Sequence, residues 1–207
     1  MNYIFDMDGT LIDSYLGITN STLKALKEFN IIKEFDDVKK GILSSSVYEY
    51  LKQTSNLYNI NFQDIYDKYK ENREFTQNEY SFMPNVIDTL VKLYNNKNRL
   101  FIFTHKGKYT INILKDRNIE YLFLDVIHSD MDIFDRKPSN KSILYLLNKY
   151  SLDKKETYYV GDRNIDILVA KNSNIKSIYY KSSDIRLLNK PDYIINDFKE
   201  ILNIKEK

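Results

Sequence analysis

The chain has 207 residues, and its 31 Lys and Arg nearly balance its 29 Asp and Glu, which gives a formal net charge of +2. This balance favours neither nucleic acid nor an anionic membrane as a partner, and the absence of cysteine excludes a disulfide framework and a thiolate metal site. Because no apolar run is long enough to span a membrane and no basic-then-apolar leader begins the chain, we expect a cytoplasmic protein.

Several common nucleotide-binding and hydrolase fingerprints are missing. The 5 glycines do not fall at the spacing of a P-loop or a dinucleotide-binding loop, and there is no Gly-x-Ser-x-Gly elbow. With 2 histidines, a histidine-rich zinc site is not expected. The length allows one good-sized core, or a core domain with a smaller insert.

The chain opens with MNYIFDMDGTLIDS, an apolar run that ends abruptly in acidic residues. Such a run predicts a buried parallel strand, and open α/β sheets bind ligands at the carboxyl ends of their strands. Asp6 and Asp8 share side-chain parity on an extended segment, so both can face one site. Carboxylates that close call for a shared proton or a cation. A structural acidic turn is the alternative; an EF-hand is excluded because Ile4 and Tyr15 would replace two of its ligands.

Apolar residues after this stretch recur at three- and four-residue intervals, which predicts helices, with Asp13 or Ser14 as the first N-cap. Polar breaks at 41–46 and 55–61 separate the expected helices. The serine-containing break at 41–46 is interpreted as a loop, either a plain helix connection or a ligand contact. We therefore expect residues 15–80 to form a small all-helical domain.

From Pro84 onward, helical and extended patterns alternate regularly. Repeated strand–helix alternation predicts a parallel sheet with right-handed crossovers and helices on both faces. The sequence thus predicts an α/β fold with a Rossmann-like core domain, residues 1–14 and 81–207, into which the helical domain 15–80 is inserted. The expected later strands lie at 100–103, 123–127, 157–160, 178–180 and 193–195.

Polar residues follow several of these strands. The carboxyl ends of parallel strands share one edge of the sheet, so these residues can converge. Four carboxylates in one place are untenable without a cation, and oxygen ligands select a hard ion such as Mg²⁺. A hydroxyl and an ammonium are suitable donors to phosphate oxygens. The residues concerned are Asp6, Asp8, Thr104, Lys137, Asp162 and Asp166.

The order and spacing of these residues resemble the haloacid dehalogenase superfamily over essentially the whole chain. The helical insert resembles the alpha-helical cap of its phosphoglycolate phosphatase-like and beta-phosphoglucomutase-like members. The segments similar to the four family motifs are Asp6-Met7-Asp8-Gly9-Thr10, Thr104 after Phe101-Ile102-Phe103, Lys137-Pro138, and Gly161-Asp162-x-x-x-Asp166.

The resemblance implies a Mg²⁺-dependent phosphatase acting on a small phosphorylated metabolite. Asp6 would be the nucleophile and would form an aspartyl phosphate. Asp8 would act as general acid and base, and would bind the metal through its backbone carbonyl. Thr104 and Lys137 would hold the phosphoryl oxygens. Asp6 would also bind Mg²⁺, as would Asp162 and Asp166, the last directly or through water.

Two other functions remain open at this point. A sugar-phosphate mutase needs the same first motif, together with cap residues that reorient an intermediate. A non-catalytic phospholigand-binding module could use the same acidic site, although a binder has no need of the general acid Asp8. Asp8 also argues against carbon–halogen hydrolysis, which needs neither the metal nor a second acid.

Other polar residues near these motifs are interpreted as structural or solvated. His105, Lys106 and Arg163 adjoin motif residues and could touch a leaving group, but we expect solvated or locally hydrogen-bonded side chains. The acidic run before Lys137 is expected to be a solvated loop rather than a second metal site. Its members are Asp130, Asp132 and Asp135.

Overall fold

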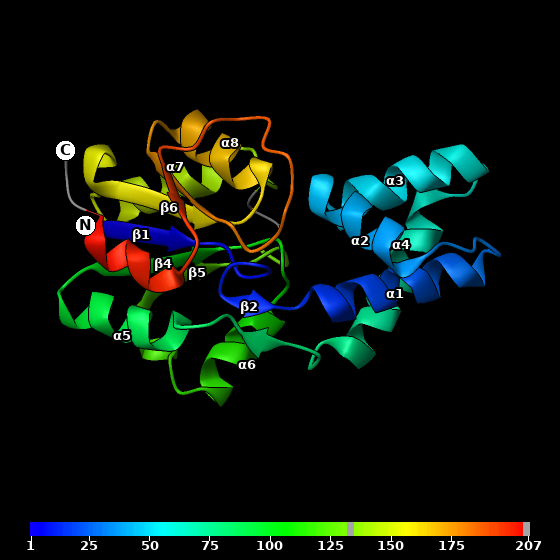
Figure 1. Cartoon of the computed structure of the whole chain (residues 1–207), viewed down its shortest axis with the longest axis horizontal. Coiled ribbons are helices and arrows are strands. Elements are labelled where there is room, and N and C mark those ends of the chain that lie inside the picture. The colour runs from blue at the N-terminus through cyan, green and yellow to red at the C-terminus, as the bar shows by residue number, and fades with distance from the viewer. Residues whose placement is uncertain (132–134, 205–207) are drawn as a thin grey trace. The chain divides into compact units, whose positions relative to one another are not determined.

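The computed structural model of the chain describes residues 1–131 and 135–204 and divides into two compact units (Figure 1). One unit comprises Met1–Ile12 and Phe82–Lys207, and the other comprises Asp13–Ser81. Where the chain passes between them, strand β2 (Ile12–Asp13) pairs with strand β3 (Ser81–Phe82). No helix in the described ranges is long and apolar enough to cross a membrane.

The first unit is built on a parallel sheet, which in the described residues has six strands in the order β5-β4-β1-β6-β7-β8. Strand β1 lies in the middle, paired with β4 on one side and β6 on the other. The predicted α/β fold is therefore confirmed. The strands are β1 (Asn2–Phe5), β4 (Arg99–Phe103), β5 (Phe123–Ile127), β6 (Thr157–Gly161), β7 (Lys176–Tyr180) and β8 (Tyr193–Ile195).

Helices cover both faces of this sheet. α5 (Val86–Asn95) and α6 (Tyr109–Asp116) lie on one face, and α7 (Lys141–Lys149) and α8 (Asn164–Ser173) lie on the other (Figure 1). Burial of the apolar stripe of each helix against the sheet provides most of the driving force for this arrangement. Short 3₁₀ helices occupy Glu120–Leu122, Lys154–Glu156 and Phe198–Asn203.

Alternate residues of β1 pack on opposite sides of the sheet, as the pleat requires. Ile4 belongs to a buried cluster with Ile143 of α7 and Val169 of α8. Phe5 points to the other side, where its ring lies 5.9 Å from that of Phe198. With both faces covered, β1 is wholly buried, and Tyr3-Ile4-Phe5 within it form a continuous apolar run rather than an alternating pattern.

The second unit is all-helical, as its periodicity predicts. It contains α1 (Tyr15–Glu28), α2 (Phe35–Ser44), α3 (Val47–Tyr58) and α4 (Phe62–Thr76). Ser14 does occupy the N-cap position of α1, but its side chain makes no capping hydrogen bond there.

The two polar breaks expected in this unit are shorter than predicted. α2 continues through Gly41 to Ser44, so the prediction of a loop over 41–46 is wrong. The hydroxyls of Ser44 and Ser45 both donate to the Gly41 carbonyl, which satisfies polar groups at the end of the helix. Ser46 then caps α3 by accepting a hydrogen bond from the backbone of Glu49. The break at 55–61 is likewise mostly helix, because α3 continues to Tyr58.

Candidate active site

The central strands of the sheet place several polar residues just beyond their carboxyl ends. The backbone N–H of Asp6 still donates to the Val160 carbonyl at 2.9 Å, and that of Thr104 donates to the Ile127 carbonyl at 3.0 Å. Both residues are therefore held by the same hydrogen-bond ladder that builds the sheet. Asp162 follows β6 directly, and Asp166 lies in the first turn of α8.

A tight turn follows Asp6. The Met7 carbonyl accepts hydrogen bonds from the backbone of Leu11 and Ile12, at 2.9 and 3.0 Å. Gly9 has a φ of 80°, in the left-handed region that glycine adopts without steric cost. This turn explains why a glycine follows the two acidic residues of the first motif.

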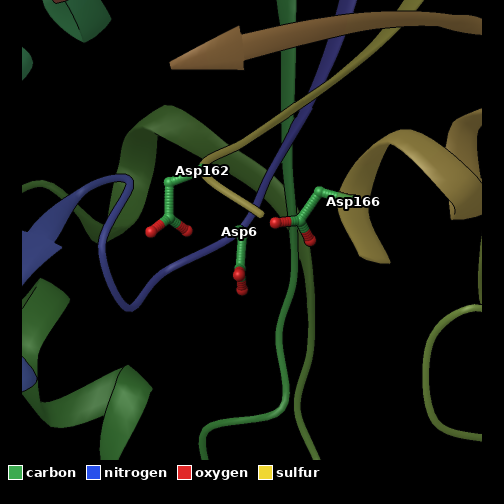
Figure 2. Close-up of side chains that lie close together, drawn as sticks. All are labelled: Asp6, Asp162 and Asp166. Atoms are coloured by element: carbon green, nitrogen blue, oxygen red, sulfur yellow. The ribbon is translucent and has the colours of Figure 1, made fainter. Parts of the chain in front are cut away.

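Three buried carboxylates meet at the edge of the sheet. Asp6, Asp162 and Asp166 each offer an oxygen, and these oxygens all lie within 4.8 Å of one another (Figure 2). Burial raises the pKa of Asp166 above its usual value, although the nearby Lys137 ammonium opposes this effect. Such a cluster of oxygen donors has the chemistry that Mg²⁺ prefers.

Lys137 lies among these carboxylates. Its ammonium is 3.0 Å from Oδ2 of Asp6 and 2.7 Å from Oδ1 of Asp166, and its side chain is fully buried. The Arg163 guanidinium adds a second positive charge, with Nη2 3.5 Å from Oδ2 of Asp6. Two cations thus face three carboxylates, which leaves the cluster with a formal charge of −1 when all are ionised.

The other carboxylate oxygens are oriented by hydrogen bonds. Oδ1 of Asp6 accepts from the Met7 backbone at 2.8 Å, and Oδ2 of Asp166 accepts from the Arg163 backbone at 3.1 Å. The Thr10 hydroxyl donates to Oδ1 of Asp162 at 3.4 Å. Asp166 also sits at the amino end of α8, where the helix dipole favours a negative charge. The carboxylates are therefore fixed in place by the fold.

Asp8 is held by a different cation. Its Oδ1 lies 3.1 Å from the Lys106 ammonium, and the Lys106 side chain is only 8% exposed. The hydroxyl of Thr104, which is itself buried, accepts a hydrogen bond from the Lys106 backbone at 3.1 Å. Through Lys106, the loop after β4 therefore links Thr104 of the second motif to Asp8 of the first motif.

The three residues adjoining the motifs have hydrogen-bonded or ion-paired side chains, which is the second of the two roles expected for them. Lys106 pairs with Asp8, and Arg163 pairs with Asp6. Nε2 of His105 accepts a hydrogen bond from the Lys137 backbone at 2.7 Å. Their position one or two residues beyond a strand-end motif residue is the signal that could have identified them.

The acidic run before Lys137 behaves as a solvated loop in its described members. Asp130 accepts from the Lys108 backbone at 2.7 Å, and Asp135 pairs with Lys141 at 2.8 Å. Both acids are exposed. The hydrogen bond from Lys141 lowers the pKa of Asp135 below its usual value. Asp132 lies outside the described residues.

Comparison with known proteins identifies the family. The model of the family described as haloacid dehalogenase-like hydrolase matches residues 3–180. "Pyrophosphatase PpaX" of Oceanobacillus iheyensis is 30% identical, over 97% of this chain and 94% of the relative. "Phosphoglycolate phosphatase" of Pasteurella multocida is 28% identical, over 98% of this chain and 96% of the relative.

Solved structures agree with these sequence matches. A "predicted phosphoglycolate phosphatase" from Haemophilus somnus is 25% identical and superposes with a TM-score of 0.81, over 97% of this chain and 96% of that one. A "putative haloacid dehalogenase-like hydrolase" from Bacteroides fragilis is 20% identical with a TM-score of 0.86, over 97% and 98%, which supports the fold. The resemblance inferred from four short motifs is thus confirmed, and the chain belongs to the haloacid dehalogenase-like hydrolase family of enzymes.

Proposed function

We propose that this enzyme is a Mg²⁺-dependent phosphatase that hydrolyses a small phosphomonoester through an aspartyl phosphate on Asp6. The observation that carries the proposal is the position of Asp6, a buried carboxylate in contact with Lys137 and grouped with two further carboxylates. Relatives named as phosphatases, which match this chain over nearly their whole length, support the same reaction class.

The donor set suits a hard divalent ion. The carboxylates of Asp6 and Asp162 would hold the metal together with the backbone carbonyl of Asp8, and Asp166 would do so directly or through water. When bound, Mg²⁺ would cancel the repulsion between these carboxylates and the substrate dianion, and would polarise the phosphoryl group.

The first chemical step belongs to Asp6 and Asp8. A carboxylate oxygen of Asp6 attacks phosphorus, so an O–P bond forms as the bond from phosphorus to the leaving oxygen breaks. Asp8 gives its proton to that leaving oxygen, which departs as an alcohol. The ion pair between Asp8 and Lys106 is consistent with a role for Asp8 that is distinct from that of Asp6.

In the second step water replaces Asp6 at phosphorus. Asp8, now a carboxylate, takes a proton from the attacking water, and the bond between Asp6 and phosphorus breaks. Inorganic phosphate leaves, and Asp6 returns as a carboxylate. Thr104 and Lys137 would hold the phosphoryl oxygens through both steps, with Lys137 offsetting the developing negative charge.

The helical unit would serve as a cap that excludes bulk water during the reaction. Two substrates follow from the names of relatives, phosphoglycolate and pyrophosphate. Both carry a negative charge beyond the phosphoryl group that is transferred. These two compounds therefore belong in any first panel, beside phosphomonoesters whose leaving groups are uncharged, including sugar phosphates.

The proposal is tested by measuring phosphate release from such a panel, with Mg²⁺ and with a chelator. We expect Mg²⁺-dependent release from at least one small phosphomonoester. Isomerisation of a hexose 1-phosphate in the presence of a bisphosphate primer, without free phosphate, would identify a mutase instead. Binding without any turnover across the panel would point to a non-catalytic phospholigand module.

A further inference from the structure

We propose that His105 is a positioning residue: it accepts a hydrogen bond from the backbone of Lys137 and so keeps the Lys137 ammonium against Asp6 and Asp166. This inference rests on the proposed function, in which Lys137 acts on the phosphoryl group. The imidazole ring of His105 contacts the backbone of Lys137. His105 would therefore act through Lys137 rather than on the substrate.

The contact joins two loops that lie 32 residues apart in the sequence. His105 follows Thr104 beyond β4, and its Nε2 accepts from the Lys137 backbone N–H at 2.7 Å. The ring is packed edge-on against Phe103, with centroids 6.4 Å apart. The Lys137 side chain is fully buried, so a shift of its backbone moves the ammonium relative to both carboxylates.

The hydrogen bond fixes the form of the imidazole. A neutral ring that accepts at Nε2 must carry its proton on Nδ1. Nδ1 is buried and has no hydrogen-bond partner in the described part of the chain. An unsatisfied buried N–H costs stability, so the arrangement gives up one hydrogen bond at Nδ1 while keeping the one that fixes Lys137.

The surroundings keep the ring neutral. Burial, and then the positive charges of Lys137, Arg136 and Arg163, hold the pKa of His105 well below its usual value. A charged ring would direct an N–H at the Lys137 N–H and lose the contact. The acceptor form is therefore kept at about pH 6.5, where an ordinary histidine begins to ionise.

Two variants of similar size separate the acceptor from the packing. His105→Gln retains an oxygen that can accept near the position of Nε2, whereas His105→Met fills the space without an acceptor. His128→Gln is the matched control, because His128 is the other histidine of the chain and also has a buried Nδ1 without a partner among the described residues.

The measurements are kcat and KM for phosphate release, and the labelling of Lys137 by an amine-acylating reagent, followed by peptide mass spectrometry. We expect kcat to fall on the order of 10- to 100-fold in His105→Met with little change in KM, since misplacement of a catalytic group by about 1 Å costs that much. Lys137 should be acylated faster in this variant. His105→Gln and His128→Gln should resemble the wild type in both measurements.

Equal kcat and equal Lys137 labelling in wild type and His105→Met would overturn the inference while leaving the phosphatase intact. Equal losses in His105→Gln and His105→Met would also overturn it, because the acceptor would then be irrelevant. If the wild type releases no phosphate from any substrate, the proposed function fails, and Lys137 labelling still decides whether His105 holds the lysine.

Discussion

The ammonium of Lys106 lies 3.1 Å from Oδ1 of Asp8, and both side chains are largely buried. Asp6 and Asp166 contact the Lys137 ammonium instead, and Asp6 also contacts Arg163. Each acidic residue of the first motif thus has its own cation. This arrangement agrees with the separate roles proposed for them: Asp6 is the nucleophile, and Asp8 transfers the proton.

Replacement of Asp8 should affect substrates according to their leaving groups. Asp8→Asn should slow hydrolysis of alkyl phosphates by about 10²- to 10⁴-fold, the usual contribution of a general acid. Nitrophenyl phosphate needs no such proton, so its first step should stay fast while the water step becomes slow. The expected signature is a burst of nitrophenolate equal to the enzyme concentration. Lys106→Met breaks the same ion pair but keeps the carboxylate, and a burst in that variant would contradict this assignment.

Asp6→Asn should remove activity without disturbing the fold. The side chain keeps its size, but an amide is a poor nucleophile, so we expect kcat to fall by on the order of 10⁶-fold, as for the loss of other enzymatic nucleophiles. Phosphate release and the circular dichroism spectrum are the measurements. Asp116→Asn, in an exposed position at the end of α6, is the control. Ordinary turnover by Asp6→Asn would refute the covalent mechanism.

Gly161 leaves room for a carboxylate. A Cβ at this position would lie 2.5 Å from Oδ2 of Asp166, a distance that forces the acidic side chain to move. Gly161→Ala should therefore raise the Mg²⁺ concentration needed for half-maximal activity by about 10- to 100-fold, as expected when support of a metal ligand is lost.

The control for this change is Gly107→Ala, which also brings a Cβ against a carboxylate. There the nearest atom is Oδ2 of Asp130 at 2.7 Å, but Asp130 is exposed and can turn away. An equal rise in both variants in the Mg²⁺ concentration needed for half-maximal activity would show that the effect is not specific to crowding at Asp166.

Much of the fold was predictable because buried parallel strands leave a strong apolar signal. The bounds of β5 and β8 agree with the prediction to the residue. Asp6, Thr104 and Asp162 follow their strands as expected. Their convergence could be predicted because parallel strands end at one edge of a sheet.

Local polarity was a less reliable guide. The polarity of the serines at 44–46 predicts a loop, whereas their hydroxyls bond the last turn of α2 and the first turn of α3. The pairing of Lys106 with Asp8 spans 98 residues and depends on the path of two loops. Neither hydrophobic periodicity nor motif spacing determines the path of a loop, so this contact could not be predicted from the sequence.

Metal binding should raise thermal stability. If the three clustered carboxylates bind Mg²⁺ only in the folded state, a concentration one hundred times the Kd stabilises the fold by about 2.7 kcal/mol, which corresponds to a shift of roughly 5–10 °C for a domain of this size. Asp162→Asn removes one ligand and should lose most of that shift. The melting temperature is measured at constant ionic strength, with Na⁺ in place of Mg²⁺ as the control. A shift of the same size in both proteins would place the ion elsewhere.

The low pKa of His105 should appear in the pH dependence of stability. The unfolded ring takes up a proton below about pH 6.5, whereas the folded ring stays neutral until its lower pKa is reached. Between those two values the unfolded state binds more protons, so acid favours unfolding, and the free energy of unfolding falls by up to about 1.4 kcal/mol per pH unit.

His105→Gln cannot take up this proton. Urea unfolding from pH 7.5 to 5.5 should therefore show the wild type losing stability faster than His105→Gln. Parallel curves would mean that the ring ionises normally in the folded protein.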